Sequence, residues 1–256
     1  MAPKAQAKSS EIHDTLWSYI NSKTIIPQDV IDSVEKEIAT FPAGSEKAYM
    51  TAILYAAKGE FDLAVEWFKD ALNSDDSTIA LNYLAYIGSS AHNYFHRLEI
   101  FRLEEQFCVP TIRRIARNAA YCIGNTKLIR SYSLKLSALC DDEERQELRE
   151  EGERMISIVE EFKRVTSLSS NQIEELCDEA EEIANKHGVN CIGAHFFVSG
   201  DSDNAYVVRA ETDDPEVLAE LNIELLCLLS SEKYRKLPFT SWFLSDVDRV
   251  EKVNVR

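Results

Sequence analysis

Glycine and proline are scarce in this chain, which has only 8 Gly and 6 Pro among 256 residues. These two residues interrupt helices and form many of the turns in proteins. A chain with so few of them is therefore favoured to form long helices joined by tight turns. The apolar content of 45% is ordinary for a globular protein and sufficient to build a core. We expect a mostly α-helical fold.

Helical spacing of apolar residues continues from Glu11 to Leu139. A first helix is indicated around Leu16, and Pro27 opens a second, which ends before Pro42. The six helices that follow are expected in pairs, at Glu46–Lys58, Phe61–Asn73, Ser77–Ile87, Tyr94–Phe107, Pro110–Cys122 and Thr126–Leu139. Helices of this length, joined in pairs by tight turns, are typical of a helical repeat array.

The segment from Tyr55 to Leu72 carries small residues at Ala64 and Ala71 and large ones at Phe61 and Phe68. Small side chains let two antiparallel helices approach closely, and large ones fill the gaps between their turns. This segment resembles the tetratricopeptide repeat. The next unit keeps Ala85, Tyr94 and Phe101 but has Arg97 where that family has a small residue, and the third keeps only the hinge and the helix lengths.

The resemblance implies a short superhelix with a concave surface for binding a partner. Because this concave face is the expected binding surface, we predict partner contacts through its inner residues Tyr49, Ile53, Ala56, Asn82 and Tyr86. A clamp for a C-terminal carboxylate would need basic residues there, and Tyr49, Ile53 and Ala56 are not basic, so such a clamp is not supported.

The second half of the chain has a different pattern. A long charged helix is expected over 141–168, either packed on the last repeat or forming a dimeric coiled coil. Ser169 and Gln172 form a capping box for another helix. Strands are expected at Cys191–Ser199, Ala205–Glu211 and Phe239–Ser245, with a helix opening at Asp214 and a fourth strand considered at Val250–Val255.

These patterns predict an α+β protein, mostly α. Its expected parts are a disordered tail (1–10), a tetratricopeptide-like domain of antiparallel helical hairpins (11–140), a connecting helix (141–168) and a small α+β domain (169–256). In that last domain, helices are expected on one face of a mainly antiparallel sheet.

Charge is unevenly distributed, although the whole chain has a net charge of −16. Residues 1–140 are nearly neutral, whereas residues 141–256 have 13 Lys and Arg against 28 Asp and Glu. Just before the acidic half, residues 97–135 have a net charge of +5. Three interpretations remain open: solvated faces, internal pairing of the basic and acidic segments, or a basic surface for a partner. The last adds Arg113, Arg114, Arg117, Lys127 and Arg130 to the candidate partner-binding residues.

No motif for catalysis or for a cofactor is present, and we predict no catalytic, cofactor-binding or metal-binding residue. His92 and His96 lack the glutamate of a zinc-binding helix. Cys191 and His195 are about 13 Å apart along one strand face, too far for a nucleophile and its base. The segment from Asp201 to Asn204 lacks most ligands of a calcium loop.

The expected function is a non-enzymatic protein-interaction module or adaptor, whose acidic half engages a basic partner, for example in an immunity or antitoxin role. The alternatives are nucleic-acid binding through residues 97–135 and an enzyme with scattered catalytic residues. The six cysteines lack disulfide or zinc spacing, and no apolar run is long enough for a membrane span. Residues 1–10 have no apolar core of a secretory signal. We expect reduced thiols and a cytoplasmic location.

Overall fold

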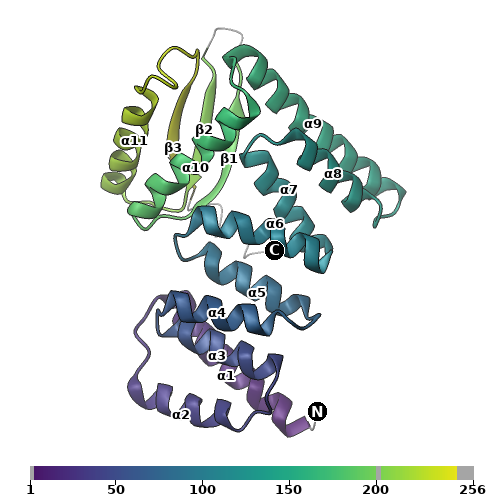
Figure 1. The fold of residues 1–256 in the computed structure, drawn as a ribbon, viewed down its shortest axis with the longest axis vertical. Helices are drawn as coiled ribbons and strands as arrows, with labels where there is room; N and C mark the ends of the chain where they lie inside the picture. The colour runs from purple at the N-terminus through teal and green to yellow at the C-terminus, as the bar shows by residue number, and fades with distance from the viewer. Residues whose placement is uncertain (1–2, 200–202, 247–256) are drawn as a thin grey trace. The chain divides into compact units, whose positions relative to one another are not determined.

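A computed structural model describes residues 3–199 and 203–246 and confirms the fold class. Within these residues the chain forms eleven helices and one three-stranded sheet, which belongs to its C-terminal part (Figure 1). The chain divides into two compact units, residues 1–86 (unit 1) and residues 87–256 (unit 2).

Unit 1 is entirely helical. Helix α3 is enclosed by its neighbours, since α1, α2 and α4 all pack against it. Phe68 of α4 is fully buried, and its ring lies 5.1 Å from that of Tyr83 and 6.0 Å from that of Tyr49. The helices of this unit are α1 (Pro3–Ser22), α2 (Gln28–Ala39), α3 (Ser45–Ala57), α4 (Phe61–Ala71) and the part of α5 (Ser77–Gly88) up to Tyr86.

Helix α1 differs from the expectation of a disordered tail over residues 1–10. The helix begins at Pro3, so residues 3–10 form its first two turns. Proline is well suited to the first position of a helix, and the alanines, glutamine and lysines that follow favour helix formation.

The first four helices of unit 2 are α6 (Asn93–Phe107), α7 (Pro110–Cys122), α8 (Thr126–Ser137) and α9 (Asp142–Thr166). The charged helix α9 packs along α8 and buries Leu148, Ile156 and Phe162. Gly152 makes this approach possible, because a Cβ atom at that position would lie 2.4 Å from the hydroxyl of Ser133 on α8. The apolar side of α9 is therefore used within the chain.

The remaining elements of unit 2 are α10 (Ser170–Lys186), β1 (Cys191–Phe197), β2 (Ala205–Ala210), α11 (Pro215–Leu229) and β3 (Thr240–Ser245). The predicted caps are present. Ser169 and Gln172 form the capping box of α10, and the side chain of Asp214 accepts hydrogen bonds from the first turn of α11.

The sheet has the order β1-β2-β3 and is mixed rather than mainly antiparallel. A hairpin pairs β1 with β2 antiparallel, whereas β2 and β3 run parallel. The reason is the connection through α11, which carries the chain back so that β3 starts at the same end as β2. The strand considered at Val250–Val255 lies outside the described residues.

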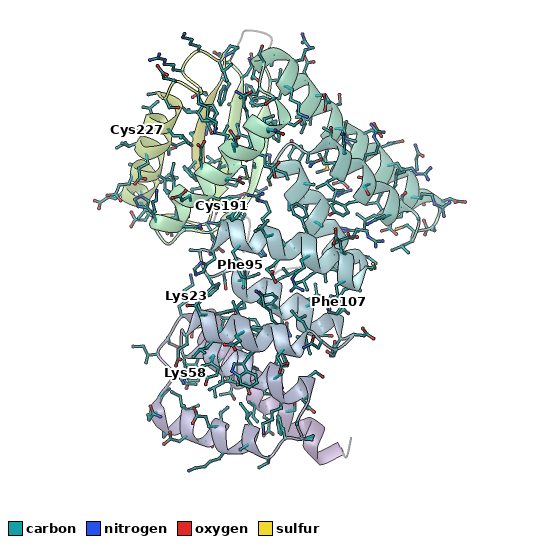
Figure 2. The ribbon with its side chains drawn as sticks, in the orientation of Figure 1. Lys23, Lys58, Phe95, Phe107, Cys191 and Cys227 are labelled. Atoms are coloured by element: carbon teal, nitrogen blue, oxygen red, sulfur yellow. The ribbon has the colours of Figure 1, made fainter. Side chains whose placement is uncertain are left out.

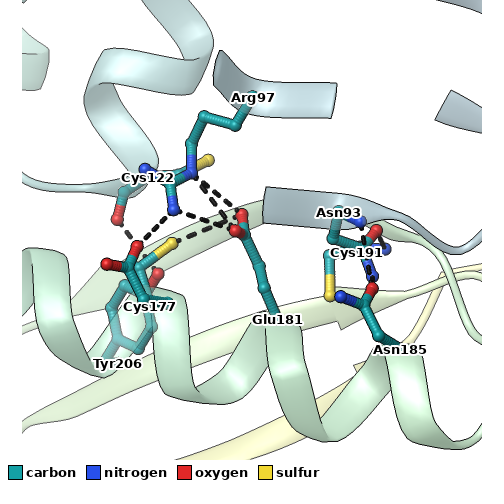
Figure 3. Close-up of polar contacts among 9 residues, drawn as sticks. Asn93, Arg97, Cys122, Cys177, Glu181, Asn185, Cys191 and Tyr206 are labelled. Atoms are coloured by element: carbon teal, nitrogen blue, oxygen red, sulfur yellow. Dashed lines mark hydrogen bonds and ion pairs between the residues drawn. The ribbon is translucent and has the colours of Figure 1, made fainter. Parts of the chain in front are cut away.

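The division of the chain differs from the expected boundary near residue 140, because α6–α8 belong to the same unit as the sheet. A buried polar network joins α6 to α10 and β1 (Figure 3). The Asn93 side chain donates to the side chain of Asn185 and to the carbonyl of Val189, and it accepts from the backbone N–H of Cys191.

Arg97 continues this network one turn further along α6. Its guanidinium donates two hydrogen bonds to Glu181 from Nε, both at 3.2 Å, and one of 2.9 Å from Nη2, and it also pairs with Asp178. The side chains of Arg97 and Glu181 are only 5% and 9% exposed. Burial raises the pKa of Glu181, and Arg97 opposes this by stabilising the carboxylate.

Replacing Arg97 with methionine is expected to lower the free energy of unfolding by about 3–5 kcal/mol, because Glu181 would be left as a buried unpaired charge. The double variant Arg97→Met/Glu181→Leu should recover most of this loss. Chemical denaturation monitored by circular dichroism measures both.

The matched control is Arg164→Met, which breaks the exposed pair of Arg164 with Glu161. We expect a loss below about 1 kcal/mol from it. Equal losses in Arg97→Met and Arg164→Met would contradict a special role of the buried pair.

Candidate protein-binding surface

The two sides of the sheet differ in exposure. Phe196, Val208 and Phe243 point to the side where the sheet meets its helices, and all three are buried. Phe197, Trp242 and Leu244 alternate with them and remain 53%, 38% and 47% exposed. We call the side that carries Phe197, Ala205, Val207, Trp242 and Leu244 the open face. Large apolar residues gathered on one exposed face are typical of interaction surfaces.

The strand register places the aromatic residues of the open face on the two outer strands. Phe197 on β1 is opposite Ala205 on β2, and Trp242 on β3 is opposite Val207. The two aromatic side chains thus stand on either side of the central strand, offset by two residues. Ala205 is the smallest side chain between them.

A depression of about 440 Å³ occupies this part of the open face. Phe197 and Trp242 form two of its walls, and the segment before β3 closes a third side. Phe239 belongs to this segment, and the centre of its ring lies 6.1 Å from that of Tyr234 and 6.3 Å from that of Phe162. The depression is lined by Phe197, Asp203, Asn204, Ala205, Leu237, Pro238, Phe239, Thr240 and Trp242.

Charges lie at two ends of the open face. At one end Arg209 pairs with Asp246, so that both charges are compensated. At the other end Asp203 is exposed, and no ion pair joins it to another residue in the described part of the chain. Asp203 therefore places a negative charge at the rim of the depression, and no described residue forms an ion pair with it.

The basic segment 97–135 is largely paired with carboxylates of the acidic half. Arg117 pairs with Glu151 at 2.8 Å, Arg130 with Glu153 at 2.6 Å and Arg114 with Glu144 at 3.8 Å. Together with the pair of Arg97 and Glu181, these contacts show that the two segments pair internally. The exposed pairs of Arg114 and Arg130 stabilise little individually, but together with the buried ones they compensate much of the charge of the basic segment.

The five basic candidates for partner binding have different environments. Arg113 and Arg117 are buried, and Arg113 pairs with the buried Glu104. Their burial does not support a direct partner contact. Arg114 and Arg130 are exposed in the ion pairs described above, and Lys127 is exposed beside Arg130 in a groove between α8 and α9.

The candidates from the helical repeat are mostly enclosed in the core of unit 1. Tyr49, Ile53, Ala56 and Tyr86 are all less than 9% exposed. The side chain of Asn82 donates a hydrogen bond to the Tyr49 hydroxyl. Because α1 packs on α3, these positions hold the unit together and do not form an open concave surface.

The structure brings together no metal site among the described residues. His92 is at the exposed start of α6, whereas His96 is directed towards Gly88, where a Cβ atom would lie 2.8 Å from its ring. His195 is exposed on the same side of the sheet as Phe197. Asp203 and Asn204 are described, but the segment before them, including Asp201, lies outside the described residues.

The open face was not predicted from the sequence. The sequence of β3 nevertheless indicates it, because Trp242 and Leu244 alternate with Phe243 and make both sides of the strand apolar. A strand that is apolar on both sides is normally covered on both. In a small domain with helices on one face, this pattern indicates a surface available to a partner.

Acid should destabilise the protein through His96. Burial lowers its pKa to about 4 from an ordinary 6.5, so the unfolded chain takes up the proton first. The stability that depends on neutral His96 is complete above pH 6.5 and is lost as the pH falls towards 4, by up to about 3 kcal/mol. The difference in unfolding free energy between wild type and His96→Gln, measured across this range, should change by that amount. Parallel curves would contradict it.

The cysteines should differ in their reactivity. All six are free, and Cys108 and Cys227 are exposed (Cys227 and Cys191 are labelled in Figure 2). Burial raises the pKa of Cys122 to about 11 and also raises the pKa values of Cys177 and Cys191 well above the ordinary value, which keeps these thiols protonated.

Brief alkylation of the native protein with iodoacetamide should therefore modify Cys108 and Cys227 first. Mass spectrometry of the digested protein identifies the modified sites. Rapid modification of Cys177 in the folded protein would show that the network around Arg97 is open to solvent.

The comparisons with known proteins assign no relative. No family model matches the chain, and no curated protein or solved structure matches it significantly. None of the described helices combines the length and the apolar character that crossing a membrane requires. The function must therefore be inferred from the surfaces of the chain.

Proposed function

We propose that this protein is a non-enzymatic protein-interaction module that binds a basic protein partner through the open face of unit 2. The observation that carries the proposal is the exposure of Phe197, Trp242 and Leu244 on one side of the sheet. Aromatic residues on a surface supply much of the binding energy at protein interfaces. The open face is also a regular, hydrogen-bonded platform, which limits the entropy lost on binding.

The charge distribution supports a basic partner. The described cations of the basic segment are mostly engaged in ion pairs, whereas the half from residue 141 onwards has 28 Asp and Glu against 13 Lys and Arg. An excess of negative charge accelerates association with a basic protein and repels nucleic acid. This favours the protein partner over nucleic-acid binding through residues 97–135.

Unit 1 has a supporting role in this proposal. Its helix pairs are proposed as a scaffold of tetratricopeptide-like type, with the candidate inner face used for internal packing. A role as adaptor, for example as the immunity or antitoxin protein of a basic toxin, is compatible with these features. Six free cysteines support a reducing compartment such as the cytoplasm.

The test compares two pairs of surface substitutions in the full-length tagged protein. Phe197→Ser/Leu244→Ser removes apolar area from the open face, and Ile223→Ser/Leu226→Ser removes a similar area from the exposed side of α11. Affinity capture from the native host at low salt, followed by quantitative mass spectrometry, measures the amount of partner retained.

We expect the open-face variant to retain at least about tenfold less of a basic partner, and the α11 variant to match the wild type. Capture should also fall when the salt concentration is raised. Circular dichroism confirms that both variants are folded. Equal retention by the two variants would contradict binding through the open face.

A further inference from the structure

We propose that the depression between Phe197 and Trp242 binds the side chain of one arginine of the partner. This inference rests on the proposed function and names the chemical group that the open face recognises. It concerns a site of about 440 Å³, which has room for a guanidinium group and the methylene groups that carry it.

The walls of the depression suit a planar group. Phe197 is on β1 and Trp242 on β3, and each strand lies about 4.8 Å from the central strand β2. Ala205 lies on β2 between them and is only 1% exposed, so a ligand would occupy the depression beside it, which Phe197 and Trp242 line. A flat group bound there would contact the aromatic surface of Phe197 or Trp242. Leu237 and Pro238 add apolar surface along which an aliphatic stem could lie.

The charge of the depression selects a cation. Ring faces of Trp and Phe attract positive charge. Asp203 adds a carboxylate at the rim, and it forms no ion pair with another described residue. The described residues that line the depression include no Lys or Arg.

Among natural cations, the guanidinium group fits this combination best. It is planar and weakly hydrated, stacks on aromatic rings, and donates paired hydrogen bonds to a carboxylate. The ammonium group of lysine is compact and strongly hydrated, so it loses more on entering a partly apolar site. Trp242 and Asp203 should together discriminate arginine from lysine.

The experiment uses the indole N–H signals of the three tryptophans in the full-length, ¹⁵N-labelled protein. The signal that is absent in Trp242→Phe belongs to Trp242. The protein is titrated with a short peptide of alternating glycine and arginine, and separately with matched lysine and citrulline peptides. Lysine keeps the charge of the probe, and citrulline keeps its shape without the charge.

We expect the arginine peptide to shift the Trp242 signal with an affinity at least about fivefold higher than that of the lysine peptide, and the citrulline peptide to leave it unchanged. Asp203→Asn should weaken binding of the arginine peptide by a similar factor. Asp213→Asn removes an exposed carboxylate elsewhere and is the control with the same change in net charge.

Three results would overturn the inference: equal affinities for arginine and lysine, a Trp242 shift produced equally by citrulline, or no shift with the arginine peptide. None of these decides the proposed function, because the capture experiment with Phe197→Ser/Leu244→Ser tests the open face without reference to arginine. If that variant loses capture but the peptides show no preference for arginine, the proposed function stands and only arginine as the ligand is contradicted.

Discussion

The arrangement of unit 2 depends on the buried contact between α6 and α10. Arg97 and Glu181 come from distant parts of the sequence and are both nearly inaccessible to water. Burying two charges is costly, and the cost is offset only where their geometry is good and their other hydrogen bonds are made. Arg97 also pairs with Asp178, and the thiol of Cys177 donates to Glu181, so both charges make further hydrogen bonds. The same contact ties the helices from α6 onwards to the α+β part, so the unit boundary falls before α6 instead of near residue 140.

This internal pairing changes the meaning of the charge pattern. The basic segment suggested a surface for nucleic acid or an acidic protein, but Arg114, Arg117 and Arg130 face carboxylates of α9. The net charge of the chain is therefore not divided into two opposed surfaces. What remains exposed is an excess of carboxylates, together with an apolar sheet face. Both features favour a partner that supplies positive charge and apolar contact.

The repeat-like region of unit 1 contributes to the core of that unit and does not offer its expected inner face to a partner. The resemblance around Tyr55–Leu72 suggested a concave surface in unit 1, yet α1 packs against α3 and encloses Tyr49 and Ile53. The surface with the most exposed aromatic area among the candidates is carried by β1 and β3. Binding modules often present such residues on rigid elements, because little conformational freedom is then lost on association.

Sequence alone determined the local features of this protein. Helical spacing located α2–α9, and the caps at Ser169 and Asp214 marked the starts of α10 and α11, because caps and periodicity depend on residues a few positions apart. Alternation located the three strands. Tertiary structure decided which partner Arg97 finds, that β3 runs parallel to β2, and which side of the sheet stays open. These outcomes depend on packing between segments 35 and 84 residues apart, and local patterns contain no information about which distant segment will cover a given face.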